Sequence, residues 1–277
     1  MGGCGFGADG KSVYEEGIQI PIMKFAERGV VNTDLVKILR TNVRDPNQVV
    51  GDFDSLAACN DVGHRRLIAM MQEIGLTSLD DLGTFIFTRT RAAILKRIAA
   101  LPQGRWTNEL VIDGYDQPVK LVAAVETRGE SLNVDFTGSD GISRWGINVP
   151  VIYTKPYACY ALKCVVAPDI PNNWASLEPF TVSSSVNILN APRPAPVRLR
   201  HVIGHMVPDL VLGALAQALP GQILAEGAAF APFGPDTMHK MPQNEVPGFY
   251  LVLPKAHRRV KTISTFCRWI ESENWAI

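Results

Sequence analysis

The sequence predicts a mixed α+β protein, in which a helical segment packs on an antiparallel β-meander and is followed by a second α/β portion. Two observations support this prediction. Between residues 31 and 103 apolar residues recur at every third or fourth position, which is the spacing of helices with one buried face. From residue 104 onward the spacing changes to two, which is typical of half-buried strands.

Three helices are expected in the helical segment. Asn32 and Asp45 are favourable N-cap residues for the first two, and Pro46 suits the first position of the second helix. The second helix is expected to end before Gly75. The third is expected at about 78–100, because proline and glycine follow it.

Strand-like and helix-like stretches alternate after the helical segment. Strands are expected at 106–113, 119–127 and 132–136, a helix at 156–166, a strand at 179–189 and a helix at 208–219. Pro192, Pro194 and Pro196 predict a rigid, extended loop before the last helix. The chain is therefore divided into an irregular lead-in at 1–30, a helical segment at 31–103, a β-meander with an α/β portion at 104–230, and a proline-interrupted tail of uncertain structure at 231–277.

The charge balance and the cysteines argue against several classes of protein. The 27 basic and 27 acidic residues give a formal net charge of zero, which removes the usual electrostatic case for binding nucleic acid or an anionic membrane. No apolar run reaches the roughly 18 residues of a membrane span, and the first residues lack the pattern of a secretory signal. Five scattered cysteines without a C-x-x-C pair argue against a disulfide scaffold or a structural zinc site, so a reducing cytoplasm is expected.

Three residues are candidates for catalytic or substrate-binding roles. His205 follows a glycine and precedes a predicted helix, where it could orient a substrate carbonyl or act as a general acid or base; alternatively, it caps that helix. Asn148 could hold a substrate amide through paired donor and acceptor atoms, or it could satisfy a turn. Arg200 could pair with a carboxylate, or it could be an ordinary surface residue.

No metal ligand and no cofactor-binding residue is assigned in this chain. His201 and His205 are four residues apart, but Gly204 and the helix start near Pro208 predict a loop here rather than a chelating helix face. The sequence also has no phosphate-binding loop of the G-x-x-x-x-G-K-[ST] type.

Seven short motifs follow one another in an order that resembles a known family. They are YEEG at 14–17, NVR at 42–44 with GD at 51–52, DFTGS at 135–139, NVP at 148–150, DIPNN at 169–173, PAPV at 194–197 and GHMVPDLVLGALA at 204–216. Together they resemble the B-type subunit of the hydantoinase B/5-oxoprolinase family, which is related to the large subunit of acetone carboxylase. The chain departs from the family pattern at Arg144-Trp145 and at Arg198-Leu199-Arg200, where smaller residues are expected.

The resemblance implies ATP-dependent hydrolysis of the C–N bond of a cyclic amide, such as a hydantoin, an oxoproline or a lactam. It implies ATP and magnesium on an A-type, nucleotide-binding partner subunit, and a divalent metal in an N-terminal half that has no counterpart here. The chain is therefore expected to be a fragment that is not active alone. Two alternatives stay open: a fragment of the large subunit of an acetone or acetophenone-type carboxylase, or a catalytically inactive assembly module for an A-type subunit.

Overall fold

The computed structural model describes residues 9–223 of the chain. All of these residues belong to one of the chain's two units, Met1–Pro232. The predicted tail at 231–277 and the last residues of the predicted α/β portion, 224–230, lie outside the described residues.

The three helices predicted for the helical segment are present. They are α1 (Thr33–Asn42), α2 (Pro46–Glu73) and α3 (Asp80–Ala99), and they are preceded by the 3-10 turn η1 (Val13–Glu15) and a hairpin of β1 (Ala26–Glu27) and β2 (Val30–Val31). Both predicted N-caps are confirmed. The side chain of Asn32 accepts a hydrogen bond from the backbone N–H of Leu35, and that of Asp45 accepts one from Gln48.

The first two helices bury little of their apolar surface within the described residues. Leu35, Leu39 and Val50 form a small buried cluster between α1 and α2. Val50 is the one buried residue of α2, although the helix has 28 residues. The apolar stripe that predicted this helix continues beyond the cluster with large exposed side chains, which include Leu56, Leu67, Met70 and Ile74.

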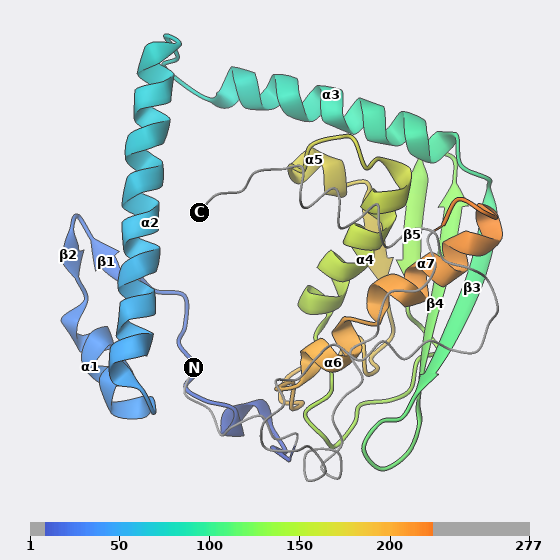
Figure 1. Cartoon of the computed structure of the whole chain (residues 1–277), viewed down its shortest axis with the longest axis horizontal. Coiled ribbons are helices and arrows are strands. Elements are labelled where there is room, and N and C mark those ends of the chain that lie inside the picture. Colours follow the sequence, from blue (N-terminus) through green and yellow to red (C-terminus); the bar gives the residue numbers. More distant parts are fainter. Residues whose placement is uncertain (1–8, 224–277) are drawn as a thin grey trace, which may run out of the picture. The chain divides into compact units, whose positions relative to one another are not determined.

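A four-stranded sheet follows the helices (Figure 1). It consists of β3 (Gly104–Ile112), β4 (Val119–Arg128), β5 (Ser131–Asp135) and β6 (Phe180–Ser183), in that order. The antiparallel pairing of β3, β4 and β5 confirms the predicted meander. The strand β6 pairs with β5 in parallel, and α4 (Val151–Val166) and α5 (Trp174–Leu177) lie between the two strands in the chain.

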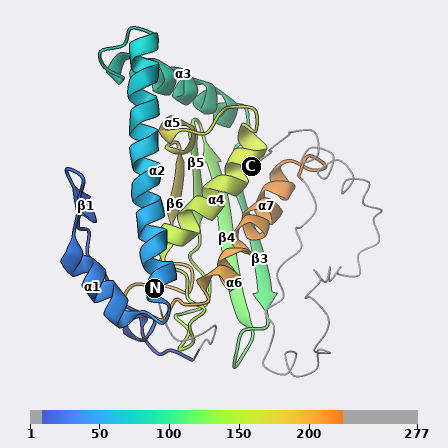
Figure 2. The same cartoon turned by 60° about the vertical axis from the view of Figure 1, so that its left-hand side comes forward.

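One face of the sheet is covered by helices (Figure 2). This face carries Leu121, Val125 and Val134, which share a buried core with α4 and with α7 (Val207–Ala218). The last turns of α3 contribute Ile94 and Ile98 to the same core. The helical segment therefore packs on the meander through the end of α3.

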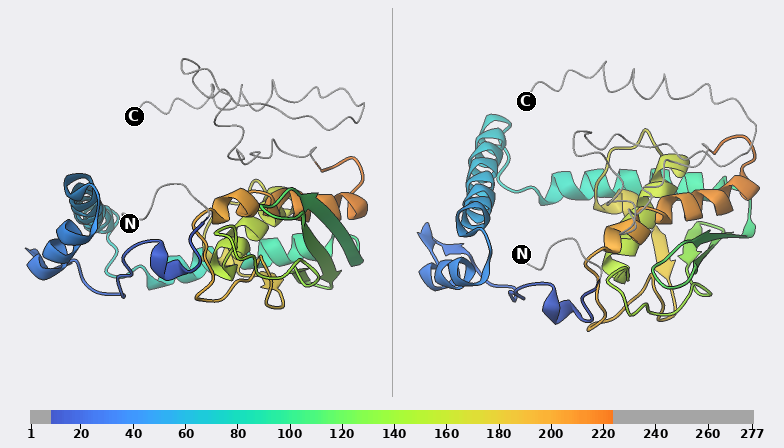
Figure 3. Two further views of the ribbon diagram at one scale, coloured as in Figure 1. Left: turned by 90° about the horizontal axis from the view of Figure 1, so that it is seen from below. Right: turned by 60° about the horizontal axis from the view of Figure 1, so that its bottom comes forward.

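The helix α7 lies beside β3 (Figure 3). This close approach is possible because Gly213 has no side chain. A Cβ atom at this position would lie 2.1 Å from the amide nitrogen of Asn108 on β3. That amide donates a hydrogen bond to the backbone oxygen of Leu210 at 3.1 Å. The opposite face of the sheet is charged, since Arg105 pairs there with Glu126 and Asp135 at 3.2 Å each.

Two helical predictions are wrong in detail. The helix predicted at 156–166 begins at Val151, so Pro156 lies inside it. The proline removes the hydrogen bond to the carbonyl of Ile152, and that residue is 80% exposed, so water can replace the bond. The loop predicted around Gly204 is a short helix, α6 (Arg200–Gly204). Within the described residues, no helix combines the length and apolarity needed to cross a membrane.

Candidate functional site

The start of α6 is held in place by the lead-in segment at the beginning of the chain. The carboxylate of Glu16 accepts hydrogen bonds from the backbone N–H groups of Val197, at 2.5 Å, and Arg198, at 2.8 Å. The backbone N–H of Val13 donates to the carbonyl oxygen of Pro194 at 3.0 Å. Glu16 thus fixes the chain just before Arg200. The sequence placed this glutamate in the YEEG motif but gave no sign of this contact.

Asn148 connects the loop around Ser143 with the proline loop around Pro196, and its side chain is fully buried. The amide nitrogen lies within hydrogen-bond distance of the carbonyl oxygens of Ser143, Trp145 and Pro196, at 2.8 to 2.9 Å, and the amide oxygen accepts from the N–H of Ser143 at 2.7 Å. These contacts use both ends of the amide. They favour the alternative in which Asn148 satisfies a turn, and its role in holding a substrate stays a prediction.

Five side chains from α4 and α6 form a continuous group, which we name the Tyr–His cluster: Tyr153, Tyr157, Arg200, His201 and His205. The two tyrosine rings stack with their centroids 4.9 Å apart, and the hydroxyl of Tyr153 donates to that of Tyr157 at 3.2 Å. The ring of Tyr157 lies 5.7 Å from that of His205, whose ring lies 6.0 Å from that of His201. The guanidinium carbon of Arg200 lies 5.6 Å from the centroid of the Tyr153 ring.

Helical spacing explains why these side chains meet. Tyr153 and Tyr157 are four residues apart on α4, and His201 and His205 are four apart along α6 and its C-cap, so each pair lies on one helix face. Two of the three residues predicted for the site, His205 and Arg200, are therefore brought together. The two tyrosines were missed, although their spacing matches that of the histidines, because it is also the spacing of ordinary helix packing.

Gly204 allows α6 to lie directly against Tyr153. A Cβ atom on this glycine would be 2.3 Å from one ring carbon of Tyr153 and 2.8 Å from another. Both distances are far below van der Waals contact, so any larger residue would force the ring or the helix to move. The glycine of the GH motif therefore has a steric role next to His205.

Burial and charge shift two of the titratable groups. Burial raises the pKa of Tyr153 to about 12, with a further contribution from the hydrogen bond to Tyr157. Its hydroxyl consequently keeps its proton, and can donate it in a hydrogen bond, to higher pH than an ordinary tyrosine. The pKa of His201 is lowered, first by burial and then by the positive charges of His205 and Arg200. His201 therefore stays neutral to lower pH than an exposed histidine, and a neutral imidazole can accept a proton.

The described residues do not provide a site for the divalent metal that the resemblance implies. Within 9–223, no three His, Cys, Asp or Glu side chains come together in a way that could hold a metal ion. His201 and His205 share a helix face, but Arg200 adds a positive charge next to them, which is unfavourable for a cation. We therefore derive no chemical step through a metal.

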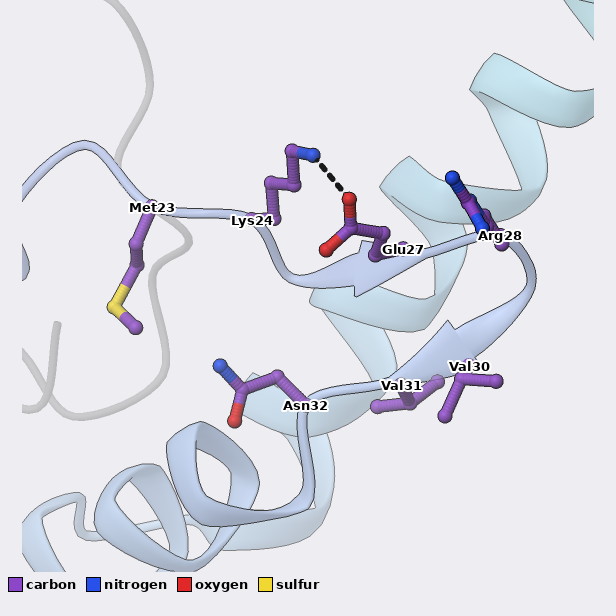
Figure 4. A pocket seen from close by; sticks show the side chains of 7 residues that line it. All are labelled: Met23, Lys24, Glu27, Arg28, Val30, Val31 and Asn32. Atoms are coloured by element: carbon purple, nitrogen blue, oxygen red, sulfur yellow. Dashed lines mark hydrogen bonds and ion pairs between the residues drawn. The ribbon is translucent and has the colours of Figure 1, made fainter.

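A cavity of about 850 Å³ lies at the β1–β2 hairpin, away in sequence from the cluster (Figure 4). It is lined by Met23, Lys24, Glu27, Arg28, Val30, Val31 and Asn32. Lys24 and Glu27 form an exposed ion pair at its edge, at 2.6 Å. None of the candidate residues lines this cavity, so we assign it no chemistry.

The described residues thus form an α/β unit with a partly exposed cluster of polar aromatic and basic side chains, a class of arrangement suited to a small polar ligand. The model of the family hydantoinase B/oxoprolinase matches residues 1–245, and the chain belongs to this family. The family suggested by the seven motifs is thereby confirmed. A curated relative, the B-type subunit of a putative D-/L-hydantoinase from Pseudomonas sp. (strain NS671), is 31% identical over 239 residues, which cover 81% of this chain and 40% of the relative.

Two solved structures show the same fold. The ATP-dependent caprolactamase from Pseudomonas jessenii is similar with a TM-score of 0.75 and 24% identity, over 82% of this chain and 41% of that chain. Nucleotide-free acetone carboxylase is similar with a TM-score of 0.66 and 11% identity, over 82% and 33%. These likenesses agree with the predicted mixed α+β fold. The chain spans about two fifths of the length of the curated hydantoinase relative.

Proposed function

We propose that the chain is part of the B-type subunit of an ATP-dependent enzyme that hydrolyses the C–N bond of a cyclic amide. Membership of the hydantoinase B/oxoprolinase family supports the reaction class. Two relatives are named as single subunits, one of a hydantoinase and one of a caprolactamase, and these names support a partner subunit. In this proposal an A-type partner binds ATP and magnesium, and a divalent metal is bound by residues outside the described range.

The observation that supports a site in this chain is the position of His205. Its exposed ring lies against Tyr157, and Arg200 belongs to the same group of side chains. An imidazole in this position can donate a proton to the leaving nitrogen or accept one from water, while the tyrosine hydroxyls can bind the amide oxygen. His205 is the proposed general acid or base, and Arg200 is a proposed binding residue.

The proposal is tested by mixing the purified chain with an A-type subunit, a polypeptide that supplies the rest of the family's length, ATP and magnesium. Ring opening of a hydantoin, 5-oxoproline and a lactam is measured together with ADP release, and the metal content of the isolated chain is determined. ATP-dependent ring opening that needs this chain together with the other proteins supports the proposal. A tight, stoichiometric metal on the isolated chain would show that metal ligands are present in it, against the sequence analysis.

An assembly role is the second candidate function, and the exposed apolar side chains of the helical segment favour it. Phe85 and Phe87 on α3 are 58% and 42% exposed, and α2 carries further exposed apolar residues. Surfaces of this kind often contact another protein. Binding of an A-type subunit without any ring opening would support this role over catalysis.

A further inference from the structure

The segment before α3 has almost no core of its own. We name residues 20–74, which hold the β1–β2 hairpin, α1 and α2, the N-terminal module. Its buried core within the described residues consists of Leu35, Leu39 and Val50, whereas the core around the four-stranded sheet has 26 buried residues. No residue of the module belongs to that larger core. Because a stable folding unit is built around a hydrophobic core, the module lacks most of its core among the residues that the structure describes.

Large exposed apolar side chains form a stripe along one face of α2. Successive members are separated by eleven, three and four residues, which is the spacing of one helix face, and we name them the α2 seam: Leu56, Leu67, Met70 and Ile74. Asn60 and Gly63 occupy the intervening positions of the same face. The whole series alternates steps of three and four residues, which is the pattern of a helix that packs along another helix.

The opposite face of α2 is charged. Arg65 lies nine residues from Leu56 and nine from Ile74, which is two and a half helical turns, so it points away from the seam. Its guanidinium pairs with the carboxylate of Asp61 at 2.9 Å, and both side chains are exposed. One face of α2 is therefore suited to water and the other to an apolar protein surface.

The missing core of the module is best supplied by the same subunit. The hydantoinase subunit from Pseudomonas sp. (strain NS671) continues well beyond the part that this chain matches. A domain that has its own core meets a partner through a surface about as polar as the rest of its exterior, whereas permanently joined parts meet through apolar faces. The N-terminal module has an apolar face and three buried core residues, which fits a permanent contact.

We propose that the α2 seam binds a helix of the remaining part of the B-type subunit, and that this contact completes the core of the N-terminal module. The inference rests on the proposed assignment of the chain to a B-type subunit, but on no step of its chemistry. The occupant is a helix with an apolar face, because the seam follows helical packing spacing and carries no charged side chain. Neither an A-type subunit nor a second copy of the chain is needed to cover it.

The test combines the full chain with the part of the Pseudomonas sp. (strain NS671) subunit that lies outside the match. Binding is measured by calorimetry, and hydrogen exchange of residues 56–74 is measured with and without the added polypeptide. The seam variant carries Leu67→Gln and Met70→Gln. The matched control carries Val62→Gln and Ile68→Gln, because all four side chains are 39% or 40% exposed but the control pair lies to either side of the seam. Circular dichroism of the chain alone checks that both variants fold.

The expected result is that a complex forms, that exchange of residues 56–74 slows at least tenfold in it, and that the seam variant weakens binding at least tenfold while the control keeps it. Absence of a complex, a complex without slower exchange in 56–74, or equal binding of the two variants overturns the proposal. It is also overturned if an A-type subunit alone slows this exchange, or if the chain alone forms a dimer that the seam variant dissociates, because the seam then belongs to that partner.

Failure of this inference and failure of the proposed function give different results. If the assembled proteins open a cyclic amide but residues 56–74 exchange as fast as in the chain alone, the hydrolase function stands and the seam contact is refuted. If the complex forms through the seam but no cyclic amide is opened after an A-type subunit, ATP and magnesium are added, the contact stands and the hydrolase function is refuted.

Discussion

Replacement of Gly204 by alanine tests the packing that builds the Tyr–His cluster. The new Cβ atom would lie 2.3 Å from a ring carbon of Tyr153, whereas ordinary contacts begin near 3.4 Å, so the ring and α6 must separate by roughly an ångström. Overpacking of this kind costs about 1–3 kcal/mol. Alanine regains about 1 kcal/mol because it suits a helix better than glycine. We expect a net loss of up to about 2 kcal/mol in the free energy of unfolding.

Urea unfolding followed by circular dichroism measures this change, and Gly83→Ala is the matched control. Gly83 lies within α3, and a Cβ atom there would have no neighbour within 4 Å, so its replacement should stabilise the protein by about 0.5–1 kcal/mol. A double variant with Tyr153→Ala separates the clash with the tyrosine ring from other effects of the new methyl group. In Tyr153→Ala the ring is absent, so adding Gly204→Ala should cost nothing further. If Gly204→Ala stabilises the protein as Gly83→Ala does, the steric role of this glycine is refuted.

Three further predictions concern the residues around the cluster. Asn148→Ala should lower the free energy of unfolding by about 3 kcal/mol, because it leaves buried backbone groups without partners; chemical denaturation measures this. Glu16→Gln should weaken the two hydrogen bonds before Arg200 and raise the KM for the cyclic-amide substrate more than it lowers kcat. Tyrosine absorbance on alkaline titration should show one phenol that ionises near pH 12, and stability should fall between about pH 10 and 12, because the unfolded chain loses the proton of Tyr153 first.

Each of these predictions has a result that would contradict it. If Asn148→Ala is as stable as the unaltered chain but no longer binds substrate, Asn148 holds the substrate rather than satisfying a turn. Glu15→Gln is the matched control for Glu16→Gln. If both variants change kcat and KM to the same extent, Glu16 has no special positioning role. Ionisation of all tyrosines near pH 10 would show that the hydroxyl of Tyr153 is not held by burial and by its hydrogen bond to Tyr157.

Local rules predicted the helical segment and the meander because their evidence lies within a few residues. Asn32 and Asp45 bond to backbone groups three residues later, so their capping could be anticipated from the sequence. The parallel pairing of β6 with β5 joins Val134 to Val182, and nothing local to either strand specifies it.

The candidate site was predicted in part for the same reason. His205 and Arg200 were identified, but the predicted loop around Gly204 was wrong because tertiary contacts stabilise α6. The N–H of Leu199, at its start, donates to the carbonyl of Gly146 at 2.7 Å, and Gly204 lies against Tyr153. Both contacts join residues more than fifty positions apart. The proposed site roles of Asn148, Arg200 and His205 stay predictions.

The central claim is that His205 acts in cyclic-amide hydrolysis by a B-type subunit, and one rate comparison tests it most directly. The chain is combined with an A-type subunit, with a polypeptide that supplies the rest of the family's length, and with ATP and magnesium. We expect His205→Gln to slow ring opening by about a hundredfold or more, as loss of a general acid or base does. The control His64→Gln, at an exposed histidine of α2, should keep the full rate. Equal rates for His205→Gln and the unaltered chain would contradict the claim.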